Sequence, residues 1–268
     1  MIDRGKHSVL GVLIDAVDYE AATERIVEAA QQRRGMAITA LAVHGVMTGV
    51  EDAEHNSRLN SFDLVTPDGQ PVRWALNWLH GAGLSDRVYG PELTICVLAR
   101  CAEDGLPVYL YGSTRETLDQ LVPALEARLP GLRVVGAEPS GFRMAEPEDP
   151  DRIAHRIRNS GARVVLVGLG CPRQEQFTHA MRPHFDGPLL AVGAAFDYHA
   201  GGLRIPPAWM QRRGLEWLWR LGLEPRRLWR RYLLLNPAYA ARLIAQRLGW
   251  RHQRPAPSTS ETTARFPV

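Results

Sequence analysis

The stretch "GLGCPRQEQF", from Gly168 to Phe177, follows the apolar run "RVVLV" and has the residue types of an anion-binding turn. A strand that ends in glycines and leads into a helix leaves backbone N–H groups without intrahelical partners, and the helix dipole favours negative charge there. Gly168 and Gly170 match the first two glycines of G-x-G-x-x-G, but Arg173 stands where the third should be. No Gly-Lys-Ser/Thr follows, so the phosphate-loop pattern is also absent. The stretch therefore predicts an anion site of another kind.

Two charged residues stand on predicted loops beside helices. "TPDGQP" places Asp68 just after a strand and before Gly69 and Gln70. A carboxylate at the carboxyl edge of a sheet can act as a general base, although an aspartate before glycine is also a common turn residue. "DRVYGPEL" offers Arg87 on a loop before a helix, where a lone arginine is typically solvated. The residues alone leave both interpretations open.

The other reactive residue types favour structural roles. "EPEDPD" contains an Asp-x-Asp, Asp149 and Asp151, a pair that holds a metal in many nucleotide-sugar enzymes. Here it precedes a predicted helix, where acids favour the dipole, so we interpret it as a helix cap. Cys171 has no readable His–Asp partnership, and the 9 histidines lack metal-ligand spacing. No metal site is predicted.

The composition is that of an ordinary soluble globular protein. The chain has 268 residues, of which 45% are hydrophobic and 23% charged, and no window holds 18 consecutive apolar residues. The N-terminal apolar run carries Asp15 and Asp18 and predicts a first strand, not a signal peptide. The 3 cysteines have neither disulfide nor metal spacing, which favours a reducing cytoplasm.

Positive charge and tryptophan gather near the C-terminus. We count eleven arginines from Arg212 to Arg254 against two acids, Glu216 and Glu224, and five of the 7 tryptophans also lie late in the chain. Basic segments with interleaved tryptophan and tyrosine suit an anionic membrane surface.

Predicted strands and helices, which must position these residues, alternate along the chain. Apolar strand candidates are "MAITALAV", "PVYLYG", "ARVVLVGLG" and "PLLAVGAAFD", separated by helical patterns, one of them capped by Ser113 or Thr114; "HSVLGVLIDAV" predicts a strand or hairpin. Near-continuous apolar strands between helices predict an α/β fold: a Rossmann-like, mostly parallel sheet with helices on both faces. Ligands of such sheets bind at the carboxyl ends of the strands.

Three regions are expected. Residues 1–202 form the α/β core, residues 203–251 form a basic, aromatic, helical appendage broken by Pro225 and Pro237, and residues 252–268 form a disordered polar tail.

Six blocks occur in one order over most of the chain: "TPDGQPV", "DRVYGPEL", "PVYLYGS", "VVLVGLGCPRQEQF", "AVGAAFDYHAGGLRIPPAWMQRRGLEWLWRL" and "EPRRLWRRYLLLNP". They resemble the WecG/TagA/CpsF family of bacterial glycosyltransferases, glycosyltransferase family 26, over about residues 8–240. The resemblance implies an inverting, metal-independent transferase without a cofactor. Such enzymes move an N-acetylmannosamine-type or other hexose from a UDP-sugar to a polyprenyl-diphosphate-linked sugar. Their products feed the synthesis of teichoic acid, capsule, exopolysaccharide or common antigen.

The resemblance also assigns roles to residues. It makes Asp68 the base and Arg87 a catalytic loop arginine. The remaining matches, with their neighbours, are expected to bind substrate: Thr39, Gly69, Gln70, Gly112, Gly168, Gly170, Pro172, Arg173, Gln174, Glu175, Arg226, Arg227, Arg230 and Arg231.

Two departures from the family pattern stand out. The family's Thr-x-Asn keeps Thr39 here but has Leu41 at the Asn position, and we expect His44 in the next turn to compensate. The family's Gly-Ser/Thr-Asp is Gly90-Pro91-Glu92 here.

Two other function classes compete with the transferase, which we favour. A nucleotide-dependent oxidoreductase would bind NAD in place of UDP, and a non-catalytic basic module would leave Asp68 without a role. The expected partners are a UDP-sugar, a polyprenyl-diphosphate-linked acceptor and an anionic membrane surface, but no nucleic acid; a homo-oligomer is compatible with the sequence. We expect a cytoplasmic protein attached peripherally to the inner face of the plasma membrane.

Overall fold

The computed structural model describes residues 1–140, 149–204 and 206–249. Its contacts divide the chain into two compact units. The first contains residues 1–22, 40–89 and the described part of 204–255, and the second contains residues 23–39 and 90–203. Helix α1 (Tyr19–Gln31) and strand β3 (Met36–Leu41) begin in one unit and end in the other.

A six-stranded parallel sheet is the centre of the fold. Its order is β4-β3-β8-β7-β5-β6, and the strands besides β3 are β4 (Leu64–Pro67), β5 (Val108–Gly112), β6 (Val134–Glu138), β7 (Val164–Gly168) and β8 (Pro188–Ala191). Strands β5 and β7 are buried along their whole length, as expected of strands covered on both faces. The predicted α/β, Rossmann-like fold is confirmed.

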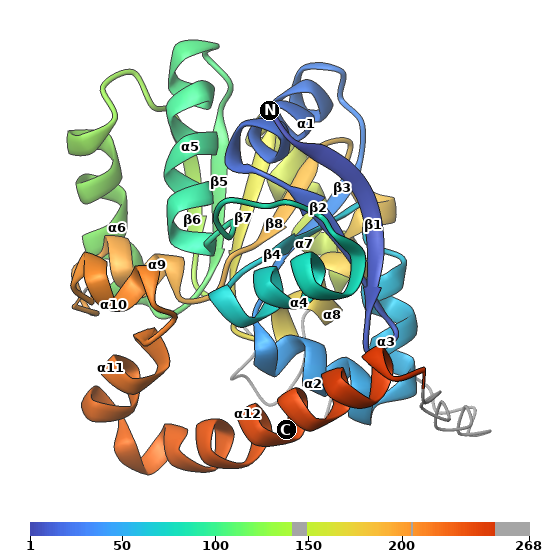
Figure 1. The fold of residues 1–268 in the computed structure, drawn as a ribbon. Helices are drawn as coiled ribbons and strands as arrows, with labels where there is room; N and C mark the ends of the chain where they lie inside the picture. Colours follow the sequence, from blue (N-terminus) through green and yellow to red (C-terminus); the bar gives the residue numbers. More distant parts are fainter. Residues whose placement is uncertain (141–148, 205, 250–268) are drawn as a thin grey trace. The chain divides into compact units, whose positions relative to one another are not determined.

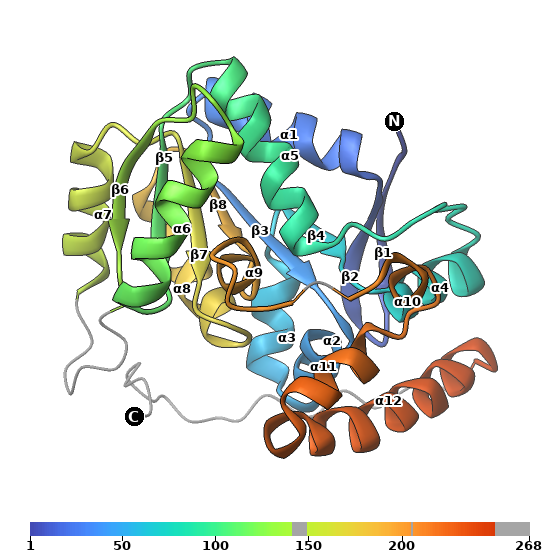
Figure 2. The same cartoon turned by 90° about the vertical axis from the view of Figure 1, so that its left-hand side faces the viewer.

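The helices of the second unit form two groups. They are α5 (Gly90–Glu103), α6 (Arg115–Arg128), α7 (Pro150–Asn159), α8 (Arg173–Met181) and α9 (Ala195–His199). A 3₁₀ turn at Arg182–His184 follows α8. Helices α5 and α6 both pack against α9, on one side of the strands in Figure 2. Helix α7 packs against α8, with Ile153, Ile157 and Met181 in one core with Val165 and Val167 of β7. Helices therefore cover both faces.

Local sequence explains where several of these helices begin. Thr114 caps α6, its side chain accepting a hydrogen bond from the Thr117 N–H at 3.2 Å, which confirms one of the two predicted caps. Asp149 caps α7 in the same way, accepting from the Asp151 N–H at 3.0 Å, and Pro150 occupies the first turn.

The first unit joins the N-terminal hairpin to the C-terminal helices. Antiparallel strands β1 (Asp3–Val9) and β2 (Val12–Val17) form the hairpin. The helices are α2 (Val43–Glu51), α3 (Ala53–Asn60), α4 (Gln70–His80), α10 (Ala208–Arg212), α11 (Glu216–Leu223) and α12 (Pro225–Arg247). Helix α12 packs against α2 and runs beside it in Figure 1. The buried carboxylate of Asp15 on β2 accepts from the Val65 N–H of β4 at 2.7 Å.

One prediction for the C-terminal helices is wrong. Pro225 does separate two helices, since it occupies the first turn of α12, but Pro237 lies inside α12 and does not break it. Proline removes one backbone hydrogen bond. Buried Leu228, Tyr239 and Leu243 fasten α12 on both sides of that point, so packing outweighs the loss.

The C-terminal helices are part of a compact unit. The Gln246 side chain accepts from the Leu10 N–H at 2.8 Å and donates to the Ser8 carbonyl at 3.0 Å. The predicted boundary near residue 203 stays a prediction, and the predicted disordered tail, 252–268, lies outside the described residues. Among the helices that are described, none is both long and apolar enough to cross a membrane.

Candidate functional site

The loop from Gly168 to Arg173 connects β7 to α8 and requires its first glycine. A Cβ at Gly168 would lie 2.7 Å from the Phe196 ring, and Gly170 has φ of +76°. The Gln174 N–H donates to the Gly170 carbonyl at 2.9 Å, so the chain turns at once into α8. The predicted strand, glycine turn and helix are all present, and the loop places the N-terminus of α8 at the end of β7.

Four parallel strands of the second unit end at the same edge. Thr39 of β3 is paired with Ala191 of β8, which is paired with Val167 of β7, and Gly112 of β5 is paired with Gly168. Gly112 and Gly168 approach closely, since a Cβ at Gly112 would be 3.0 Å from the Gly168 carbonyl. The structure thus brings Thr39, Gly112 and the Gly168 loop to one carboxyl edge, where ligands of such sheets bind.

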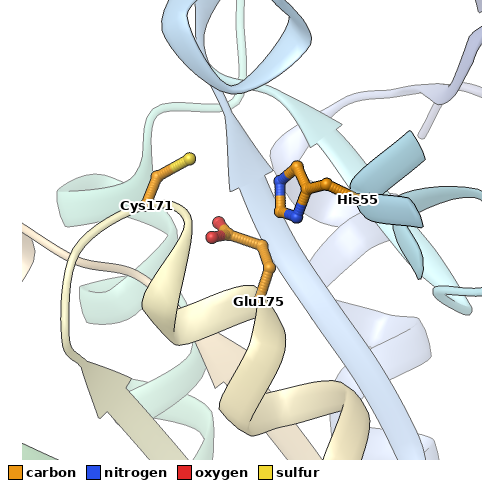
Figure 3. A group of neighbouring side chains, drawn as sticks. All are labelled: His55, Cys171 and Glu175. Atoms are coloured by element: carbon orange, nitrogen blue, oxygen red, sulfur yellow. The ribbon is translucent and has the colours of Figure 1, made fainter. Parts of the chain in front are cut away.

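Glu175 accepts several of the side-chain hydrogen bonds at this edge. Its fully buried carboxylate accepts from the Thr39 hydroxyl and from the Gln174 amide, each at 2.9 Å, and from the side chain of Cys171. Figure 3 shows the Cys171 and Glu175 side chains approaching each other from the loop and from the first turn of α8. His55, also drawn there, belongs to the first unit. The loop is therefore tied to β3 through one carboxyl group.

Burial has the largest effect on the pKa of Glu175. It raises the pKa of the Glu175 carboxyl above its usual range, although the hydrogen bonds from Gln174, Thr39 and Cys171 act in the opposite direction. The second carboxyl oxygen, Oε2, and Oε1 of Gln174 are buried without a hydrogen-bond partner among the described residues. Buried orphan acceptors are costly, so a ligand or a proton that satisfies them would be favoured. Arg173, by contrast, is exposed.

The first unit holds the second group of predicted residues. Asp68 follows β4, and its N–H donates to the Leu41 carbonyl at 3.2 Å and the Thr66 carbonyl at 3.0 Å. Gly69, with φ of +108°, precedes α4. The turn therefore fixes Asp68 at the carboxyl end of β4, half-buried. This is the placement that a general base would need, and a glycine is required after it.

Arg87 is buried beside this turn and is bound by an acid that sequence reasoning missed. Its two Nη atoms donate to the two carboxyl oxygens of Glu216, the first residue of α11. Its guanidinium lies over the Tyr89 ring, 4.2 Å from the centroid. Burial lowers the pKa of Arg87, but hydrogen bonds to Glu216 and the charges of Glu216, Asp68 and Tyr89 raise it overall. Arg87 is not the solvated arginine that the motif alone suggests.

A polar chain links Arg87 to the Asp68 turn. Oδ1 of Asp86 accepts from the Arg87 N–H and from the Gln70 amide, each at 2.8 Å. The Tyr19 hydroxyl accepts from the Tyr89 N–H at 2.9 Å, and burial raises the pKa of Tyr19. Asp68, Gly69, Gln70 and Arg87 are thus neighbours within the first unit.

The substitution of Leu41 for the family's asparagine has a structural counterpart. Leu41 is fully buried, so its side chain offers no polar contact, and its carbonyl binds the Asp68 N–H. His44, expected to compensate, stands on α2 with its Nδ1 3.0 Å from the Thr48 hydroxyl. Its role stays a prediction.

The C-terminal arginines are described only in part. Arg226 is exposed at the start of α12. Arg227, Arg230 and Arg231 belong to the same helix, but their side chains lie outside the described ones. Their proposed contacts with a diphosphate stay predictions.

The two acids of the Asp-x-Asp pair, Asp149 and Asp151, contact groups of the protein itself. Asp149 caps α7, and an Asp151 carboxyl oxygen lies 2.7 Å from Nδ1 of His184. The helix-cap interpretation is therefore confirmed for Asp149. Within the described residues of either unit taken singly, no three histidine, cysteine or acidic side chains bring their ligand atoms together as in a metal site.

Sequence reasoning missed several members of these groups because nothing local marks them. Glu216 is 129 residues from Arg87, and Tyr19 is 70 residues from Tyr89. Gly193 was also missed, although a Cβ there would lie 2.9 Å from Oε1 of Gln174 and its φ is +51°.

The second unit thus carries the glycine turn and the buried Glu175 at the carboxyl ends of its strands, and the first unit carries Asp68 and the buried Arg87. Enzymes with parallel α/β sheets bind their ligands at such strand ends. The sequence matches the Glycosyl transferase WecG/TagA/CpsF family over residues 7–253. The chain therefore belongs to this family, as the motifs indicated, and its role is that of a glycosyltransferase.

Proposed function

We propose that this protein transfers a hexose, N-acetylmannosamine-type or related, from a UDP-sugar to a polyprenyl-diphosphate-linked sugar, with inversion and without a metal ion. The reaction belongs to cell-surface polysaccharide synthesis at the inner face of the plasma membrane, in the making of teichoic acid or exopolysaccharide. The observation that carries this proposal is the placement of Asp68 at the carboxyl end of β4, electrostatically coupled to Arg87.

The proposed step is a single displacement. Asp68 takes the proton of the acceptor hydroxyl while that oxygen attacks the anomeric carbon of the donor. The bond between the anomeric carbon and the diphosphate oxygen breaks, and its electron pair leaves with UDP. One attack from the opposite face inverts the anomeric configuration. Cationic and backbone N–H groups, among them Arg87, stabilise the charge that develops on the diphosphate. Glu216 takes two of the five N–H donors of Arg87, which leaves three for other partners.

The glycine turn between β7 and α8 is the proposed site for part of the UDP moiety. Its support is the N-terminus of a nine-residue helix, whose dipole favours an anion. Buried Glu175 stands in its first turn and holds the loop in place by accepting hydrogen bonds from Thr39 and Gln174.

The C-terminal helices are the proposed membrane contact. Exposed apolar side chains are Trp209 on α10, Leu218 and Leu223 on α11, and Trp229, Leu233, Leu234 and Ile244 on α12. Exposed Arg226 and Arg212 lie among them. Tryptophan at headgroup level and arginine near anionic lipid would give reversible attachment.

A screen of UDP-sugars tests this function. Each donor is incubated with a short-chain polyprenyl-diphosphate-sugar acceptor, and release of UDP and the glycosylated product are measured. The expected result is one donor class that yields product with inverted anomeric configuration. Binding of NAD in place of UDP, or no transfer from any donor, would contradict the proposal.

A further inference from the structure

The ion pair between Arg87 and Glu216 is deeply buried. The side chains are 6% and 13% exposed, and both oxygens of Glu216 bind the guanidinium. A charge buried this far is stable only when it is compensated, so each residue depends on the other.

Both ends of the pair are firmly held. The Arg87 N–H binds Asp86, which also binds Gln70, two residues after Asp68. Glu216 is the first residue of α11, where an acid is favoured by the helix dipole. The turn before it packs closely: a Cβ at Gly214 would lie 2.9 Å from the Trp74 ring and 3.1 Å from Gln70.

A second acid, Asp68, stands two residues before Gln70, which Asp86 joins to Arg87 by hydrogen bonds. After Glu216, the charge of Asp68 is the next that acts on Arg87. Without Glu216, the buried guanidinium would be uncompensated and would turn to Asp68. A bidentate pair with arginine stabilises the ionised carboxylate and makes it a poorer proton acceptor.

We propose that Glu216 is a positioning residue: by binding both Nη atoms of Arg87 it keeps the guanidinium off Asp68 and in place for the diphosphate. This inference rests on the proposed function, since it takes Asp68 as the base. It gives α11 a part in the reaction that does not depend on the C-terminal arginines or on a membrane.

The test measures kcat and KM of the full chain with a water-soluble acceptor analogue. Glu216→Gln is expected to lower kcat by about 10²-fold, the loss typical of a misplaced reacting group, with little change in KM for the donor. Glu216→Asp, which keeps the charge on a shorter arm, is expected to recover part of that loss. Glu51→Gln is the matched control. It removes a carboxylate that lies 3.8 Å from Arg242 of α12 in an exposed pair, and it should stay within about twofold of wild type.

A double substitution separates positioning from folding. Arg87→Gln lowers activity by itself, but in that background Glu216→Gln is expected to cost less than about twofold, because no guanidinium is left to position. In this neutral pair neither charge is left buried without its partner, so its fold can be compared with wild type even if a single variant unfolds. Glu216→Asp, which keeps the charge, then reports the loss of activity against wild type.

The outcomes are distinct. A wild-type kcat for Glu216→Gln would overturn this inference but not the proposed function. Tighter UDP binding by that variant would do the same, because it would show that Glu216 occupies the place of the diphosphate. Equal losses with and without Arg87 also overturn it. A wild-type protein that transfers from no UDP-sugar overturns the proposed function and this inference with it.

Discussion

The Thr39 hydroxyl donates a hydrogen bond to the buried carboxyl group of Glu175, 2.9 Å away and 136 residues later in the chain. The bond joins the end of β3 to the first turn of α8. It fixes the glycine turn that follows β7 to β3, which is separated from β7 by β8 in the same sheet, so the proposed donor site depends on a buried acid.

This relationship predicts an unusual pH dependence of stability. Burial raises the pKa of Glu175, so the folded protein holds its proton to higher pH than the unfolded chain, whose glutamate pKa is about 4.3. The free energy of unfolding contributed by this group is therefore fully present below about pH 4.3. It falls as pH rises towards the folded pKa, by up to about 1.4 kcal/mol per pH unit.

Glu175→Gln removes that titration and should flatten the fall in stability above pH 4.3. Urea unfolding at a series of pH values measures it, with exposed Glu126→Gln as the control that keeps the wild-type slope. Identical pH profiles for wild type and Glu175→Gln would show that the carboxyl group is ionised at no cost.

Asp68→Asn is expected to fold normally and to lose most transfer activity. The two side chains have the same shape, but the amide cannot accept the acceptor's proton, and loss of a general base typically costs about 10²–10⁴-fold. Turnover is measured with the best donor from the screen, and circular dichroism checks the fold. Asp104→Asn, a carboxylate bound to Gln31 far along the sequence, serves as the control. Near-wild-type turnover would end the assignment of Asp68 as base.

Transfer activity is expected to survive EDTA. The Asp-x-Asp pair is engaged elsewhere, Asp149 as a helix cap and Asp151 with His184, and we assign charge stabilisation to arginine and backbone N–H groups. Initial rates are compared before and after chelation. A loss that Mg²⁺ or Mn²⁺ restores would show that a metal takes part.

Substitution of Leu233 and Leu234 by glutamine is expected to weaken liposome binding several-fold while leaving the fold intact. These side chains are 55% and 61% exposed, so they contribute little to the core but offer apolar area to a bilayer. Co-sedimentation with anionic and neutral vesicles measures the effect, and the loss should be larger than that of Trp78→Ala on α4, whose indole is also exposed.

Removing residues 203–268 is a less specific test of the same segment. It would delete buried Leu228, Tyr239 and Leu243 as well as Glu216, so binding and activity should both fall together with stability. Unchanged vesicle binding by the leucine variant would mean that α12 is only a packed helix.

Gly168→Ala is expected to destabilise the protein by about 1–3 kcal/mol, the usual cost of overpacking a core. The added methyl group would meet the Phe196 ring at 2.7 Å, at the point where the glycine turn begins. Gly222→Ala is the contrast, because it stands on α11 with no atom within 4 Å of the new Cβ. Alanine in a helix is favoured there by up to about 1 kcal/mol. Thermal unfolding of both variants decides whether close packing requires the glycine.

The sequence by itself determined the class of fold and the local features of the site. Apolar runs between helical patterns predict the parallel sheet because each strand is covered on both faces. The caps at Thr114 and Asp149 and the glycine turn at Gly168 follow from interactions within a few residues, so they can be read locally. Asp68 and Arg87 were singled out from motifs on short loops, and their roles stay predictions.

Only the tertiary structure decided which partners these residues have. The pairing of Arg87 with Glu216, and of Thr39 with Glu175, joins positions more than a hundred residues apart, and no local pattern encodes such a contact. The same holds for Pro237, where intrinsic propensity predicted a break and packing of α12 kept the helix continuous. Propensity acts over one or two turns, whereas burial and charge compensation are settled by residues that the fold brings together.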